Sequence, residues 1–79
     1  MNAKEIKNQI DKIIEIHEEE SNLECYGEIE EVLKSNGIEK YQISIDGIFE
    51  SAGYDVYSIT VAWWQDGEIQ LLTSNIGIA

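Results

Sequence analysis

The hydrophobic positions near the start of the chain repeat at helical spacing. The stripe consists of Ile6, Ile10, Ile13, Ile14 and His17. Just before it, Asn2 and Glu5 have the spacing of a capping box, in which each side chain accepts a hydrogen bond from the other residue's backbone N–H. The pattern therefore predicts a helix over residues 3–19.

A second helical stripe follows after a short break. It consists of Tyr26, Ile29, Val32 and Leu33. Ser21 and Glu24 have capping-box spacing at its start. Asn36-Gly37 is typical of a helix C-terminus, because glycine adopts the left-handed conformation without steric cost. We predict a helix over about residues 22–35, joined tightly to the first helix around Ser21.

After Gly37 the hydrophobic period falls to two. Residues 41–46 alternate between apolar and polar side chains, and residues 57–63 do the same, which predicts two half-buried strands. Residues 47–53 contain two glycines and predict a loop between these strands.

The end of the chain predicts a hairpin. Asp66-Gly67 is a strong signal for a two-residue turn, and residues 68–73 supply the third strand. Residues 74–79 are apolar and can extend that strand. Together these elements predict a single α+β domain over residues 1–79, with two N-terminal helices packed on a three-stranded antiparallel meander (ααβββ).

The predicted turn also sets the register and the faces of the sheet. It pairs Trp64 with Ile69 and Ala62 with Leu71, on the face opposite Trp63. Two helices can cover only one face of such a sheet. The other face is therefore either a partner surface or covered by the C-terminal tail.

The composition restricts the classes of partner. The formal net charge is −11, from sixteen acids against five lysines, and there is no arginine. Arginine is the usual reader of phosphate and guanine, so these numbers argue against binding to DNA, RNA, nucleotides or an anionic membrane. A basic protein is the expected partner.

The same composition bears on location. The single cysteine, Cys25, cannot form an internal disulfide, which fits a reducing compartment. The chain has neither an apolar signal segment nor a run of eighteen apolar residues. Its richness in Ile, Lys, Glu and Asn is typical of low-GC bacteria and their phages. We expect the protein in the cytoplasm of a bacterial host cell.

A run of eight glutamates between residues 15 and 31 contains no basic residue. They are Glu15, Glu18, Glu19, Glu20, Glu24, Glu28, Glu30 and Glu31. Like charges repel, and acids at the end of the first predicted helix also oppose its dipole. On one helix the run would extend roughly 25 Å at about 1.5 Å per residue. Its charge density approaches the ~3.4 Å phosphate spacing of a DNA strand.

Two interpretations of this run remain open: a surface that meets a basic partner, or a solvated acidic face. The adjacent tryptophans also allow two interpretations. Trp63 and Trp64 point to opposite faces of a strand, so one belongs to the core. The other is an interface anchor or is covered by the tail. With Trp64 we group Ile69 and Leu71 as candidate partner-binding residues.

Catalytic and metal sites find little support. His17 and Cys25 are too few for a zinc site, which needs three or four ligands, so we interpret them as a boundary histidine and a buried, inert thiol. No nucleophile-elbow, phosphate-loop or zinc-protease motif is present. We expect no enzymatic activity, no metal and no cofactor.

In its size, acidity, lack of arginine and helix-plus-sheet design, the whole chain resembles small acidic phage- or plasmid-encoded inhibitors. This group includes anti-CRISPR proteins and other DNA-mimic, anti-defence proteins. The resemblance implies a non-enzymatic inhibitor that blocks a partner's nucleic-acid-binding site. The chain shares no motif with the group, so the resemblance assigns no role to any single residue.

The leading hypothesis is therefore a binding module whose glutamates mimic phosphates on a basic, nucleic-acid-binding protein. One alternative is a homo-oligomeric structural or assembly protein that pairs through its apolar sheet face, with a homodimer through the hairpin as the simplest case. Another is an immunity protein or antitoxin that neutralises a basic nuclease. A ligand-binding domain between helices and sheet is a weaker option.

Overall fold

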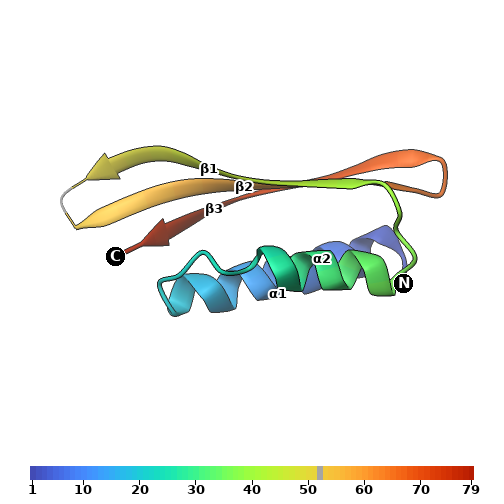
Figure 1. The fold of residues 1–79 in the computed structure, drawn as a ribbon, viewed down its shortest axis with the longest axis horizontal. Coiled ribbons are helices and arrows are strands. Elements are labelled where there is room, and N and C mark those ends of the chain that lie inside the picture. Colours follow the sequence, from blue (N-terminus) through green and yellow to red (C-terminus); the bar gives the residue numbers. More distant parts are fainter. Residues whose placement is uncertain (52) are drawn as a thin grey trace.

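Two helices form one layer of the molecule and a three-stranded sheet forms the other (Figure 1). The computed structural model describes residues 1–51 and 53–79. The element order is two helices followed by three strands, so the predicted ααβββ arrangement is confirmed. The long axis of the molecule measures 43 Å and the other two axes 19 and 18 Å.

Helix α1 spans Ala3–Glu19, as predicted. Asn2 Oδ1 accepts a hydrogen bond from the Glu5 N–H, and the Glu5 carboxylate accepts one from the Asn2 N–H, which completes the capping box. After the helix ends at Glu19, Ser21 adopts the left-handed conformation, with a φ of 53°. The Ser21 and Asn22 N–H groups donate back to the carbonyl oxygens of Glu18 and His17, the pattern of a Schellman motif.

Helix α2 spans Tyr26–Ser35, so it begins four residues later than predicted. The expected capping box at Ser21 does not form, because Ser21 is used to close α1 in the left-handed conformation. The amide oxygen of Asn22 instead accepts from the Glu24 N–H. The predicted C-terminus is confirmed: Gly37 has a φ of 76° and its N–H donates to the Lys34 carbonyl.

The sheet consists of β1 (Tyr41–Ser51), β2 (Tyr54–Gln65) and β3 (Glu68–Ile78), all antiparallel in the order β1-β2-β3. The prediction of a loop over residues 47–53 is wrong, because β1 continues to Ser51. The glycine at 47 adjoins a register shift between Gly47 and Phe49, so it marks a bulge within the strand. Ala52 lies outside the described residues.

The predicted hairpin is present. Asp66 and Gly67 have φ angles of 53° and 78°, the positive values that a two-residue type I′ turn requires. Trp64 pairs with Ile69 and Ala62 pairs with Leu71, in the predicted register. The C-terminal tail extends β3 as far as Ile78 and does not fold over the sheet.

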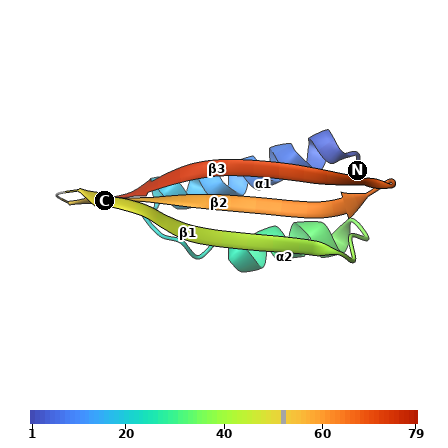
Figure 2. The same ribbon diagram turned by 90° about the horizontal axis from the view of Figure 1, so that it is seen from above.

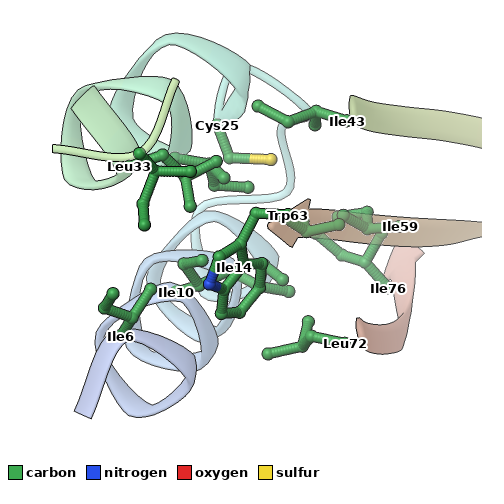
Figure 3. Packing of buried hydrophobic residues seen from close by; sticks show 13 residues of the cluster. Ile6, Ile10, Ile14, Cys25, Leu33, Ile43, Ile59, Trp63, Leu72 and Ile76 are labelled. Atoms are coloured by element: carbon green, nitrogen blue, oxygen red, sulfur yellow. The ribbon is translucent and has the colours of Figure 1, made fainter. Parts of the chain in front are cut away.

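The core lies between the two layers. Seen from above, α1 runs beneath β3 and α2 beneath β1, on the same face of the sheet (Figure 2). Ile6, Ile10 and Ile14 of α1 belong to one buried cluster with Trp63, Leu72 and Ile76 of the sheet. Leu33 of α2 and Cys25 belong to the same cluster, and Cys25 lies near Ile43 (Figure 3). All of these side chains are buried. The Trp63 indole N–H is satisfied by Gln65 Oε1 at 2.9 Å.

Candidate functional site

The eight glutamates separate into two groups in the structure. Three of them bind other parts of the chain and therefore contribute to the fold. Glu18 Oε2 accepts a hydrogen bond from the Gly77 N–H at 2.8 Å, which connects α1 to the end of β3. Glu28 and Glu30 bind His17 and Tyr41.

His17 is buried, not at the boundary as expected, and it connects three segments. Its Nδ1 contacts the amide oxygen of Asn22, and its Nε2 lies 3.0 Å from Glu28 Oε1. Both partners are acceptors, so a ring protonated at both nitrogens can donate to each. The hydrogen bond to Asn22, followed by that to Glu28, raises the pKa of His17 above its usual 6.5, although burial acts in the opposite direction.

Glu30 links α2 to the first strand. Its Oε2 accepts a hydrogen bond from the Tyr41 hydroxyl at 2.6 Å, and its Oε1 lies 3.6 Å from Lys34 Nζ. The bond from Tyr41 lowers the pKa of the Glu30 carboxyl. The same bond raises the pKa of Tyr41 to about 12, because the carboxylate binds the protonated phenol.

The other five glutamates form what we call the acidic surface: Glu15, Glu19, Glu20, Glu24 and Glu31. All five side chains are exposed, and among the described residues their carboxylates have no hydrogen-bond or ion-pair partner. Glu15 and Glu19 lie on the side of α1 away from Ile10 and Ile14, and Glu31 lies two residues from both Ile29 and Leu33. These positions place Glu15, Glu19 and Glu31 on the side of the helical layer that faces away from the sheet.

The acidic surface is spread over the end of α1, the connection after it and α2, so it is not a single row of charges. The length of roughly 25 Å would apply only to a single helix. In the structure α1 and α2 run in opposite directions, and the chain reverses between residues 20 and 25 (Figure 1). The negative charge is concentrated at this end of the molecule. Residues 15–31 and 46–55 hold eleven acids and no lysine, whereas the rest of the chain holds five acids and five lysines. The formal charge of −11 therefore belongs to one end.

The candidate anchors Trp64, Ile69 and Leu71 lie together on the sheet face away from the helices. Their exposed fractions are 48%, 65% and 57%. The alternative that the tail covers Trp64 is wrong, since residues 74–78 continue β3. The acidic surface and these anchors lie on opposite sides of the molecule, so a single flat partner surface cannot contact both.

Exposed aromatic residues at the far end of the sheet were not anticipated from the sequence. Phe49 and Tyr54 are 57% and 47% exposed, near the end where β1 and β2 extend beyond the helices (Figure 1). Phe49 pairs with Val56, and both lie on the face that carries Trp64. Tyr54 lies over Gly77 so closely that a Cβ at position 77 would overlap its ring. Because residues 47–53 were expected to form a loop, this exposed surface was not predicted.

Cys25 is fully buried, and its pKa is raised chiefly by burial, as expected of an unreactive thiol. Among the described residues, no three His, Cys, Asp or Glu side chains are grouped so that they could hold a metal ion. Within the same part of the chain, no helix has both the length and the apolarity to cross a bilayer.

Comparison with protein-family models gives no match, and comparisons with curated proteins and with solved structures give no significant match either.

Proposed function

We propose that the protein is a non-enzymatic binding module whose acidic surface docks onto a basic, nucleic-acid-binding site of a partner protein and blocks it. The observation that carries this proposal is the division of the glutamates. Five of the eight are exposed and have no hydrogen-bond or ion-pair partner among the described residues, and Glu15, Glu19 and Glu31 also face away from the sheet. Contacts within the fold account for Glu18, Glu28 and Glu30, and Glu20 helps to raise the pKa of His17. No described hydrogen bond or ion pair uses the other four carboxylates of the acidic surface.

The position of the acidic surface supports a role beyond solubility. Glu19 and Glu20 follow one another at the C-terminal end of α1, where negative charge opposes the helix dipole by about 0.3–1 kcal/mol per residue. Repulsion among the five carboxylates adds to this cost. A basic partner would remove both penalties on binding, so the strain stored in the free protein becomes part of the binding free energy.

The mechanism is electrostatic. With the whole formal charge at one end, the molecule approaches a basic site with that end first, and its long-range field accelerates the encounter. The carboxylates then take the places of a few phosphates. The basic site of a nuclease or of a defence effector would be such a partner surface. An anti-defence inhibitor and an immunity protein therefore share this mechanism and differ only in the partner.

The experiment compares two variants with equal charge. In the test variant, Glu15, Glu19, Glu20 and Glu31 become glutamine. In the control variant, Asp11→Asn, Glu39→Gln, Asp66→Asn and Glu68→Gln remove four acids elsewhere; these are exposed and lie outside the acidic end. Each variant loses four negative charges and retains a formal charge of −7, from −11.

Immobilised wild type and both variants are used to capture proteins from the host lysate, and a captured protein is purified for gel-shift assays with DNA and RNA. We expect wild type and the control variant to release nucleic acid from it and the test variant to fail. If both variants release nucleic acid from the captured protein equally well, the acidic surface is only a solvated face and the proposal is wrong. The wild-type affinity should also fall as salt increases, because exposed charges are screened beyond about 8–10 Å.

A further inference from the structure

The sheet face away from the helices, which we call the outer sheet face, is nearly uncharged in a strongly charged molecule. Its centre carries small polar side chains: Ser44, Ser58, Thr60, Thr73 and Asn75. Around that centre, only Lys40 and Asp46 are charged among the described residues of the face. A surface with so little charge has no means of recognising the basic partner proposed for the opposite side.

Apolar side chains lie at both ends of this face. Trp64 lies four residues from Thr60 in one direction along β2, and Val56 lies four residues away in the other. Ile69 and Leu71 accompany Trp64, and Phe49 accompanies Val56 across the strand pairs. Along its length the face therefore has an apolar end, a polar centre and a second apolar end. The centre lies near Thr60.

One end of the face is hollow, and the other carries an exposed aromatic side chain. A hollow of about 410 Å³ lies beside Trp64 and is lined by Lys40, Gln42, Ala62 and Ile69 among others. Phe49 is 57% exposed at the opposite end of the same face. A two-fold rotation about an axis in the plane of the sheet, perpendicular to β2 at Thr60, brings Phe49 of one copy over the hollow of another.

We propose that a second copy of this chain covers the outer sheet face, in an antiparallel two-fold sandwich in which Phe49 of each copy enters the hollow beside Trp64 of the other. In this arrangement Trp64 faces Val56 of the second copy. Ile69 meets the Tyr54 ring where that ring covers Gly77. The polar centres face each other, so Thr60 lies close to its own symmetry mate.

Charge selects the antiparallel orientation. Stacking the sheets with their strands parallel would place two acidic ends, each with the full formal charge of −11, side by side. The antiparallel orientation places each acidic end beside the other copy's lysine-containing end. It also brings Lys40 within reach of Asp46 of the second copy, so the two charged side chains in the described part of the face are paired.

The size of the face fits a stable dimer. Three strands about 4.8 Å apart and about 40 Å long give a flat footprint of roughly 600 Å². Side-chain relief raises the accessible area toward the ~800 Å² per partner of a standard interface. The dimer leaves both helical layers outside, so it would present two acidic surfaces, although the pairing itself does not depend on the proposed function.

Sedimentation equilibrium over a range of concentrations tests the proposal, with Ile69→Lys compared against Ile16→Lys. Both isoleucines are more than half exposed, but Ile16 lies on α1. The wild type should sediment at twice its 9.0 kDa mass. Ile69→Lys should raise the dissociation constant of the dimer at least about tenfold, and Ile16→Lys should leave it within about twofold.

The orientation is tested by exchanging the paired charges. Lys40→Asp and Asp46→Lys should each weaken the dimer, and the double variant should recover it. A wild type that remains monomeric at high micromolar concentration would overturn the proposal. So would a dimer that Ile16→Lys weakens and Ile69→Lys does not. A dimer weakened by Ile69→Lys but not rescued by the double exchange would overturn the antiparallel arrangement.

Discussion

The carboxylate of Glu18 accepts a hydrogen bond from the backbone N–H of Gly77 at 2.8 Å, across 59 positions of the sequence. Its neighbour Glu19, one residue later on the same helix, has no such partner among the described residues. β3 is an edge strand, so the Gly77 N–H points away from the sheet and Glu18 satisfies it. Two adjacent acids thus have different roles. Comparing the stabilities of variants at the two positions measures the contribution of the Glu18 hydrogen bond.

We predict that Glu18→Ala destabilises the protein by about 1 kcal/mol relative to Glu19→Ala, because only the first removes a hydrogen bond. Both changes relieve unfavourable charge at the end of α1 and raise helix propensity equally, so these effects cancel in the comparison. Urea denaturation of the two variants provides the measurement. Equal stabilities would show that the bond to Gly77 does not contribute to the fold.

The pKa of His17 predicts how stability depends on pH. Because its folded-state pKa is raised above 6.5, the protonated ring stabilises the fold. This contribution is complete below pH 6.5 and is lost as the pH rises through the folded-state value. We expect the stability advantage of wild type over His17→Gln to be larger at about pH 6 than at about pH 8. An advantage that grows with pH would contradict the assignment.

The pKa of Tyr41 leads to a second prediction, about stability at alkaline pH. Its pKa is raised to about 12 by Glu30, so the neutral phenol stabilises the fold. That stabilisation is complete below the usual pKa of 10 and is lost as the pH rises from 10 toward 12. Ultraviolet titration of the four tyrosines should therefore show Tyr41 ionising late. In Glu30→Gln the late transition should move to lower pH.

The two tryptophans should respond differently to truncation. Trp63 is 1% exposed in the core, so Trp63→Ala should cost about 3–5 kcal/mol of stability. Trp64 is 48% exposed, so Trp64→Ala should cost about 1 kcal/mol in the monomer. Denaturation at low protein concentration separates this effect from dimerisation. Acrylamide should quench the fluorescence of a Trp63→Phe variant, which retains Trp64, more strongly than that of Trp64→Phe.

Local signals predicted most of the fold. The isoleucine stripe and the Asn2–Glu5 spacing defined α1 to the residue, because both depend on neighbours three or four positions apart. The Asp66-Gly67 turn defined the pairing of Trp64 with Ile69, because a two-residue turn leaves only one register. Alternation then placed the two tryptophans on opposite faces, and Trp63 is the one in the core.

The errors arose where one residue satisfied two patterns. Ser21 has the spacing of an N-cap for the second helix, but it closes the first helix instead. Gly47 is a loop signal in the sequence and lies next to a bulge in the structure. In both places the local pattern allowed two conformations, and packing of the helical layer against a long sheet selected one.

The sequence by itself determined the elements, their order, the register of the hairpin and the excess of negative charge, since these follow from periodicity, turn chemistry and composition. Only the tertiary structure decided which glutamates are structural. Glu18, Glu28 and Glu30 find partners 59, 11 and 11 positions away, and no local pattern encodes such distances. Tertiary packing also placed the acidic surface and Trp64 on opposite sides, because two helices can bury only one face of a sheet.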